Sequence, residues 1–412
     1  MARLAGLLLL TILLCPASTL VKDGGALLRT GCLPDDDRIA ALPPGHPVEI
    51  RYGLSGSETP CYKVRTQIDG AAVEGWLTAD ALDGLDAFDR KRRSAAEIDV
   101  PRVIRAEVES IRRSLPAGSG AGPMMEAVRL IESRQPRQAL AVLEGVLGKG
   151  SRDPEVLALA GLAAYQNDNP RQAIEYWRES LELRPSAPIQ QLYRKAEREL
   201  AADVSSQKLH GMRFVLRYDG AAVEPAVAQQ MVQALDEEYA RISFALGCRA
   251  EEQITAIVQT REAYLKSTDA AEWSGGLYDG RIRVALMEHG VGARTRRTFA
   301  HEIVHACLAA MGHFPSWLHE GLAQKHSGES LSPALLSRLK AELRNGAIPR
   351  LGNLSQTWSR LSTQHAALAY ASALAAVETM YRDFGDDYVR NLLRNPELLP
   401  QLTAELERRL VQ

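Results

Sequence analysis

The sequence carries no excess of charge of either sign. Lysine and arginine number 49 against 51 aspartates and glutamates, which gives a formal net charge of -2. A chain balanced in this way offers no electrostatic reason for nucleic acid or an anionic membrane to be its main partner, so we expect no nucleic-acid partner. A hydrophobic content of 46% with 24% charged residues is typical of a soluble globular protein.

Long hydrophobic runs are also lacking, except at the N-terminus. Arg3 precedes an apolar stretch over residues 4–14, and small residues follow it. This pattern is typical of a secretory signal, and the run is shorter than the about 20 residues that a membrane span needs. We predict a signal peptide over residues 1–19, cleaved near Ala17 to Thr19, and no transmembrane segment after its removal. The expected location is therefore the periplasm or the exterior of a bacterium.

Cysteine is scarce, at five residues in 412. An exported chain can keep disulfides. Cys32 and Cys61 fall in one small N-terminal segment, and we predict that they pair. Cys248 and Cys307 both fall in the C-terminal region, where a disulfide and two buried free thiols agree equally well with the sequence.

The length of 412 residues predicts two to four domains. Residues 47–52 and 61–65 alternate between polar and apolar, and Asp69-Gly70 is a turn signal, which predicts a small β-module over residues 25–85. Residues 86–122 are expected to form a linker with one helix, because the chain after residue 115 is rich in glycine and proline.

The predicted β-module resembles the bacterial SH3-like barrels. The likeness rests on Pro44-Gly45 before a strand and on Gly75-Trp76-Leu77 near the end of the segment. Such modules in exported proteins often bind cell wall or other proteins, so the resemblance implies a partner of that kind. A stable spacer without a ligand is the alternative.

An internal repeat lies within residues 123–202. The segment 135–140 (Gln-Pro-Arg-Gln-Ala-Leu) recurs at 169–174 (Asn-Pro-Arg-Gln-Ala-Ile), an offset of 34 residues, which is the tetratricopeptide period. The second unit resembles that family at Leu157, Gly161, Ala173, Trp177 and Pro185. The resemblance implies a helical array that binds extended segments of partner proteins. Two repeats give little groove, so a rigid arm between the other domains is the alternative.

Two histidines four residues apart, His301 and His305, lie in an apolar segment that is predicted to be helical over residues 294–311. At this spacing two neutral imidazoles face the same side of a helix and can hold one Zn²⁺. Glu302 stands beside the first histidine, where it can polarise a water at the metal. Glu320 follows 15 residues after His305, on a second helix for which Ser316 is the expected N-cap, and is the predicted third ligand.

Other histidines compete for the third position, namely His313, His319 and His326. A metzincin site would need histidine six residues after His305, where Met311 stands, so that pattern is excluded. His319 adjoins Glu320 and points about 100° away on the same helix, so both cannot face one metal well. We keep Glu320 as the third ligand and His319 as the alternative.

The segments 301–305 (His-Glu-Ile-Val-His) and 315–323 (Pro-Ser-Trp-Leu-His-Glu-Gly-Leu-Ala) together resemble the gluzincin metallopeptidases. The likeness is to bacterial peptidase MA-like domains, whose second motif reads Trp-Leu-x-Glu-Gly-x-Ala, and it covers roughly residues 208–395. It implies an α+β thermolysin-like domain over residues 208–412. It also implies Zn²⁺ as the cofactor, three metal ligands (His301, His305 and Glu320), and Glu302 as the general base.

The resemblance further implies a donor for the oxyanion and an edge strand for the substrate. Relatives often use a tyrosine or histidine as the donor, and Tyr370 is our first candidate, with Tyr278 second. A hairpin is predicted around Asp279-Gly280. Its second strand, residues 281–286, is expected to be a half-exposed edge that pairs with extended substrate, the alternative being an ordinary sheet strand.

The sequence therefore predicts a multidomain protein with a small all-β SH3-like barrel, an α-helical tetratricopeptide-like array and an α+β gluzincin domain. The expected function is that of an exported zinc metallopeptidase acting on peptide or protein substrates. The alternative is an envelope scaffold or binding protein that uses its SH3-like and repeat modules, with a vestigial zinc domain.

Overall fold

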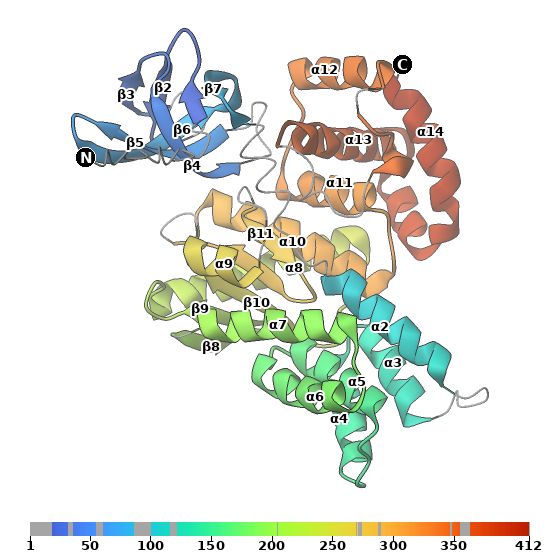
Figure 1. The fold of residues 1–412 in the computed structure, drawn as a ribbon. Coiled ribbons are helices and arrows are strands. Elements are labelled where there is room, and N and C mark those ends of the chain that lie inside the picture. The colour runs from blue at the N-terminus through green and yellow to red at the C-terminus, as the bar shows by residue number, and fades with distance from the viewer. Residues whose placement is uncertain are drawn as a thin grey trace, which may run out of the picture. The chain divides into compact units, whose positions relative to one another are not determined.

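The computed structural model describes residues 19–31, 36–54, 61–85, 100–115, 122–203, 205–268, 270, 274–286, 290–346, 348–354 and 363–411. The chain divides into two compact units, Met1–Ser94 and Ala95–Gln412 (Figure 1). The predicted signal peptide lies outside the described residues except for Thr19, which begins the first strand. None of the helices in the described part of the chain is both long and apolar enough to span a membrane.

The N-terminal unit contains a seven-stranded antiparallel sheet in the order β3-β2-β6-β5-β4-β1-β7. Its strands are β1 (Thr19–Val21), β2 (Ala26–Arg29), β3 (Arg38–Leu42), β4 (Pro47–Leu54), β5 (Cys61–Ile68), β6 (Ala71–Thr78) and β7 (Leu82–Asp83), with a 3-10 turn at Ala79–Ala81. The alternation at residues 47–52 and 61–65 is confirmed as β4 and β5. The predicted turn at Asp69-Gly70 joins β5 to β6, and both residues have positive φ, 50° and 82°.

The lack of a side chain at Gly75 lets two strands of this unit pack closely. A Cβ placed on Gly75 would lie 2.5 Å from Cγ of Leu28, so the packing of β6 on β2 requires glycine there. Cys61 is buried and disulfide-bonded. Cys32 lies outside the described residues, so its predicted pairing with Cys61 stays a prediction.

Six helices between residues 100 and 202, which we call the helical array, share one apolar core. They are α2 (Val100–Ser114), α3 (Pro123–Glu132), α4 (Pro136–Leu147), α5 (Pro154–Gln166), α6 (Pro170–Leu183) and α7 (Ala187–Ala202). Helices α5 and α6 pack closely at Gly161, because a Cβ there would lie 2.2 Å from Nε1 of Trp177. The helix expected within residues 86–122 is α2, and Ile104 and Val108 bury its apolar face in the core of the array.

The rest of the second unit is built on a five-stranded mixed sheet in the order β11-β12-β10-β9-β8. The strands are β8 (Ser206–His210), β9 (Phe214–Asp219), β10 (Ile254–Gln259), β11 (Gly276–Tyr278) and β12 (Ile282–Ala285). Strands β9, β10 and β12 are parallel, and the outer strands β8 and β11 run antiparallel to their neighbours.

Seven helices accompany this sheet. They are α8 (Pro225–Leu246), α9 (Arg261–Thr268), α10 (Ala293–Met311), α11 (Ser316–Ser327), α12 (Pro333–Arg344), α13 (Thr363–Arg394) and α14 (Leu399–Val411), with 3-10 turns at Leu351–Asn353 and Pro396–Leu398. Helix α10 ends before Gly312, as predicted. The N-cap of α11 is Pro315 rather than the predicted Ser316, which is the first helical residue.

The predicted hairpin at Asp279-Gly280 is confirmed, since Tyr278 pairs with Ile282 across it. The prediction that its second strand is a half-exposed edge is wrong. Strand β12 lies between β11 and β10, and all four of its residues are buried. The outer strand is β11. Alternating arginines indicated an exposed face, but Arg281 and Arg283 are buried among carboxylates instead.

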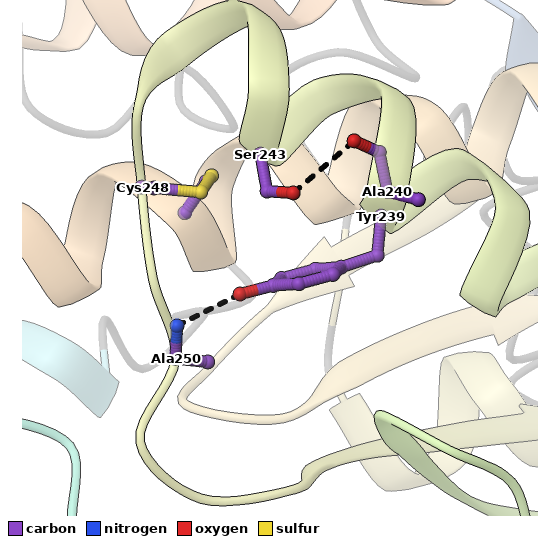
Figure 2. The surroundings of a disulfide bond; sticks show 6 residues. Tyr239, Ala240, Ser243, Cys248 and Ala250 are labelled. Carbon is purple, nitrogen blue, oxygen red and sulfur yellow. Dashed lines mark hydrogen bonds between the residues drawn. A yellow bond between two sulfur atoms is a disulfide. The ribbon is translucent and has the colours of Figure 1, made fainter.

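A disulfide joins α10 to the chain that follows α8. Cys307 on α10 pairs with Cys248, and their Cα atoms are 5.5 Å apart. Figure 2 shows the surroundings, where the backbone N–H of Ala250 donates to Oη of Tyr239 at 2.7 Å. The sequence left this pair open between a disulfide and two free thiols, and the structure contains the disulfide.

Candidate metal centre

Helix α10 carries both histidines of the candidate site. Its apolar face, which includes Phe299, Ile303 and Val304, is fully buried in the core of the second unit. Burial of that face fixes the rotation of the helix, so His301 and His305 both lie on the other side. Their ring centroids are 5.0 Å apart with the planes nearly perpendicular, at 74°.

Helix α11 supplies the third side chain, Glu320. Trp317, Leu318 and Leu322 are buried around it. A Cβ on Gly321 would lie 2.4 Å from the carbonyl oxygen of Ala373, so only glycine lets α11 approach α13 this closely. The apolar and glycine positions of the Trp-Leu-x-Glu-Gly segment thus seat the helix that presents Glu320.

The three side chains bring one donor atom each to a common point. Oε2 of Glu320 lies 3.4 Å from Nε2 of His301 and 3.7 Å from Nε2 of His305. Within the described part of the chain, the group of His, Cys, Asp or Glu residues able to hold a metal is this one, with its donor atoms within 4.8 Å of one another. Donor atoms around a tetrahedral metal with bonds of about 2.0–2.1 Å lie about 3.3 Å apart, so the observed separations suit such an ion.

The electrostatic surroundings of the two histidines differ. Burial opposes protonation of His301, but its hydrogen bond to Glu320 and the charges of Glu302 and Glu320 prevail and raise its pKa to about 9. Burial lowers the pKa of His305 well below its usual value, and the neighbouring charge of His301 lowers it further. The neighbouring carboxylates therefore favour a proton on His301, whereas burial favours the neutral form of His305.

Glu302 lies under strand β11. Its side chain is buried, and a Cβ placed on Gly276 would lie 2.4 Å from its Oε1, so the strand covers the carboxylate with bare backbone. Oε2 of Glu302 has no hydrogen-bond partner among the described residues. Burial raises the pKa of Glu302 to about 8, although the charge of His301 opposes the shift. These surroundings favour the protonated form of Glu302 more than water does for an ordinary glutamate.

His319 lies behind His305 and outside the three-residue group. The Nδ1 atoms of His305 and His319 are 3.4 Å apart, and their rings are stacked with centroids 5.6 Å apart. Burial lowers the pKa of His319 to about 4, so the ring is neutral. His319 therefore holds the outer nitrogen of His305 while Nε2 of His305 faces Glu320, and Glu320 is the residue that completes the group.

Replacement of His319 by alanine should weaken metal binding by about 10- to 100-fold, as removal of outer-shell partners of metal-bound histidines typically does. The measurement is a competitive zinc titration against a chromophoric chelator. His326→Ala is the matched control, because His326 is on the same helix but bonds to Oη of Tyr381 at 3.1 Å. Equal affinities for the two variants would show that the His305–His319 contact does not orient the site.

The other histidines considered as metal ligands lie away from the three-residue group, and the structure does not test the two tyrosines considered as oxyanion donors. His313 is exposed just after α10, and His326 contacts Tyr381. Tyr370 is half-buried on α13, where its carbonyl oxygen accepts a bond from Gln324 at 2.9 Å. Tyr278 is on β11, with the guanidinium of Arg134 5.8 Å from its ring centroid. The oxyanion role of either tyrosine stays a prediction.

The sequence did not predict that β11 and the helical array contact residues beside the candidate metal centre. The sequence predicted a hairpin around Asp279-Gly280, but it did not predict that Gly276 lies over Glu302. Arg134, at the turn between α3 and α4, reaches Tyr278 from the array. Neither contact could be predicted from local sequence patterns, because the residues in each pair lie far apart along the chain.

Comparison with known proteins found no family model that matches the chain and no curated protein that resembles it significantly. The candidate metal centre therefore rests on its own geometry. Two imidazoles and a carboxylate converge on one point, and a second, buried carboxylate stands beside them.

Proposed function

We propose that this protein is a zinc-dependent peptidase that hydrolyses peptide bonds in peptide or protein substrates. The observation that carries the proposal is the convergence of His301, His305 and Glu320 within 4.8 Å, with Glu302 buried beside them. Three protein ligands with a fourth position left open are typical of catalytic zinc sites, whereas structural sites use four. The three side chains keep between 13% and 20% of their surface exposed, so a substrate can reach them.

The donor set fits Zn²⁺ in chemistry as well as in spacing. Imidazole suits zinc, and a set of two imidazoles and one carboxylate matches known catalytic zinc sites. Oε2 of Glu320 faces Nε2 of both histidines, at 3.4 Å from His301 and 3.7 Å from His305, so all three atoms can bind one ion. When bound, Zn²⁺ would polarise the scissile carbonyl and lower the pKa of a coordinated water toward about 7.

Side chains and one strand of the protein would carry out the remaining steps of the reaction. Glu302 takes the proton from the attacking water and delivers it to the leaving amine, a role that its buried position beside the three ligands supports. Strand β11 pairs with β12 on one side, and we infer that its other edge receives extended substrate as an added strand. Tyr370 or Tyr278 donates to the developing oxyanion.

The purified protein should bind about one zinc ion and cleave an unstructured protein such as casein, because the described donors supply three of the four positions of one zinc site. A chelator should abolish cleavage and added zinc should restore it. Glu320→Ala should lose both the metal and the cleavage, as measured by metal analysis and by release of labelled peptides. Full cleavage by metal-free protein would refute the proposal.

The finer domain assignments belong to the same proposal. The seven-stranded unit supports an SH3-like barrel, the helical array supports tetratricopeptide-like repeats, and the mixed sheet with α10 and α11 supports a gluzincin fold. The first two modules would bring a protein or cell-wall partner to the enzyme. The disulfide between Cys248 and Cys307 supports export to an oxidising compartment such as the periplasm.

A further inference from the structure

A set of charged side chains is buried where the helical array meets the mixed sheet. We call it the buried charge network: Asp168, Lys195, Glu199, Asp279, Arg281 and Arg283. None of the six has more than 5% of its surface exposed. Three come from the array and three from the β11–β12 hairpin, and Arg217 of β9, which is also buried, joins the network at Asp168.

Glu199 on α7 is the centre of the network. Its carboxylate accepts from Nη2 of Arg281 at 3.0 Å and lies 2.6 Å from Nη2 of Arg283. Within the array it also receives the hydroxyl of Tyr165 and lies 3.3 Å from Nζ of Lys195. The arginines of the hairpin and the cation of α7 together hold the pKa of Glu199 well below its usual value, against the effect of burial.

Asp168 forms a second link, from the turn between α5 and α6. Oδ1 of Asp168 lies 3.4 Å from Nη1 of Arg281 and 3.1 Å from Nη2 of Arg217 on β9. The guanidinium of Arg281 also stacks over the ring of Tyr165, with 4.0 Å between Cζ and the ring centroid. Arg281 is thus enclosed by array residues on several sides.

The hairpin has too few carboxylates to satisfy its own arginines. Asp279 accepts from Nε of Arg283 at 2.7 Å and lies 3.5 Å from Nε of Arg281. That leaves two buried guanidinium groups and one carboxylate within the hairpin. A buried charge without a partner is strongly unfavourable, so the buried conformation of the hairpin depends on Glu199 and Asp168.

The same hairpin reaches the candidate catalytic residue. At its turn, a Cβ on Gly280 would lie 3.4 Å from Nη1 of Arg134, which also stacks on Tyr278. At the other end of β11, Gly276 lies against the carboxylate of Glu302. One three-residue strand therefore connects the helical array with Glu302.

We propose that the helical array is a positioning part of the catalytic unit: through the buried charge network it holds the β11–β12 hairpin and keeps β11 seated on Glu302. Glu199 is the main positioning residue, because it binds both arginines. The catalytic consequence rests on the proposed peptidase function, whereas the structural coupling does not. The array then acts on the active site directly, beyond any recruitment of a partner.

The test compares two buried carboxylates of the array in the full-length protein. Glu199→Gln removes the charge that faces the hairpin and keeps the shape. Glu107→Gln is the matched control, because Glu107 is equally buried but its partners, Arg184 at 3.2 Å and Ser186 at 3.1 Å, belong to the array itself. Amide hydrogen exchange is followed in residues 274–286, together with zinc affinity and the kinetic constants for peptide cleavage.

Glu199→Gln should raise exchange in residues 274–286 about tenfold or more, because it allows the hairpin to open locally. We expect kcat to fall about tenfold and KM to rise, since the base is displaced and the substrate edge on β11 loosens, while zinc affinity changes little because the ligands stay in place. Glu107→Gln should leave exchange in residues 274–286 and kcat at the wild-type values. If Glu199→Gln does not fold, Arg281→Lys, which keeps the charge and loses the paired geometry, should give the same pattern with smaller changes.

Three results would overturn the proposal. Equal exchange in residues 274–286 for Glu199→Gln and Glu107→Gln would show a general loss of stability instead of a specific link. Unchanged exchange in both Glu199→Gln and Arg281→Lys would show that the network does not hold the hairpin. Raised exchange with an unchanged kcat would show that the array does not position the base. A wild-type protein without peptidase activity would refute the proposed function, while the exchange data would still decide the coupling.

Discussion

Glu302→Gln should lower kcat for peptide cleavage by about 10²- to 10⁴-fold, the usual contribution of a positioned general base. Glutamine has nearly the same shape, so the packing of Gly276 over this side chain should persist. The amide cannot take a proton from the attacking water. Because Glu302 is not among the three converging donors, zinc affinity should stay within a few-fold of wild type.

Single-turnover cleavage of a fluorogenic peptide, with metal content measured on the same sample, separates the two effects. Glu302→Asp is the second variant to measure, since it keeps the carboxylate but shortens the side chain by one methylene. Its kcat should lie between those of the wild type and Glu302→Gln. Wild-type turnover by a zinc-loaded Glu302→Gln protein would show that another group acts as the base.

Removal of the Cys248–Cys307 disulfide should cost about 4 kcal/mol of unfolding free energy, because the bond closes a long loop in the unfolded chain. The two cysteines are 59 residues apart in sequence. Cys307 also lies on α10 just beyond His305, so the bond ties the helix of the metal ligands to the end of α8. The double variant Cys248→Ala/Cys307→Ala should unfold at a clearly lower urea concentration than the oxidised wild type.

The measurement is urea unfolding followed by a probe in the second unit, with a reducing agent added to wild type as an independent route to the same state. Cys61→Ala serves as the control, because Cys61 belongs to the N-terminal unit. It should leave the transition of the second unit in place. An unchanged midpoint for the double variant would mean that the disulfide adds no net stability.

Features that depend on neighbouring residues were predictable from the sequence. The spacing of His301 and His305 places both on one side of a helix, and Asp279-Gly280 marks a hairpin turn, as the structure confirms. The exclusion of His319 in favour of Glu320 followed from their directions on one helix. In each case the deciding interaction lies within a few residues along the chain or within one turn of a helix.

Features that depend on distant partners were not predictable. The alternation at residues 281–286 indicated an exposed edge because charged side chains normally face water, yet the partner that buries Arg281 is Glu199, 82 residues away in sequence. Strand β8 gave no signal for the opposite reason, since four of its five residues are exposed and polar and lack an apolar pattern. The pairing of Cys248 with Cys307 likewise needed the tertiary fold.

The buried charge network also bears on where this chain can be divided for expression. A fragment that begins at β8 would keep the candidate metal ligands, but it would expose Arg281 and Arg283 to solvent without Glu199 and Asp168. Helix α2 belongs to the same apolar core as α7, through residues such as Val108 and Leu192. The smallest recombinant fragment expected to stay soluble and monodisperse therefore begins before Val100, although the candidate metal-binding residues lie some two hundred residues later.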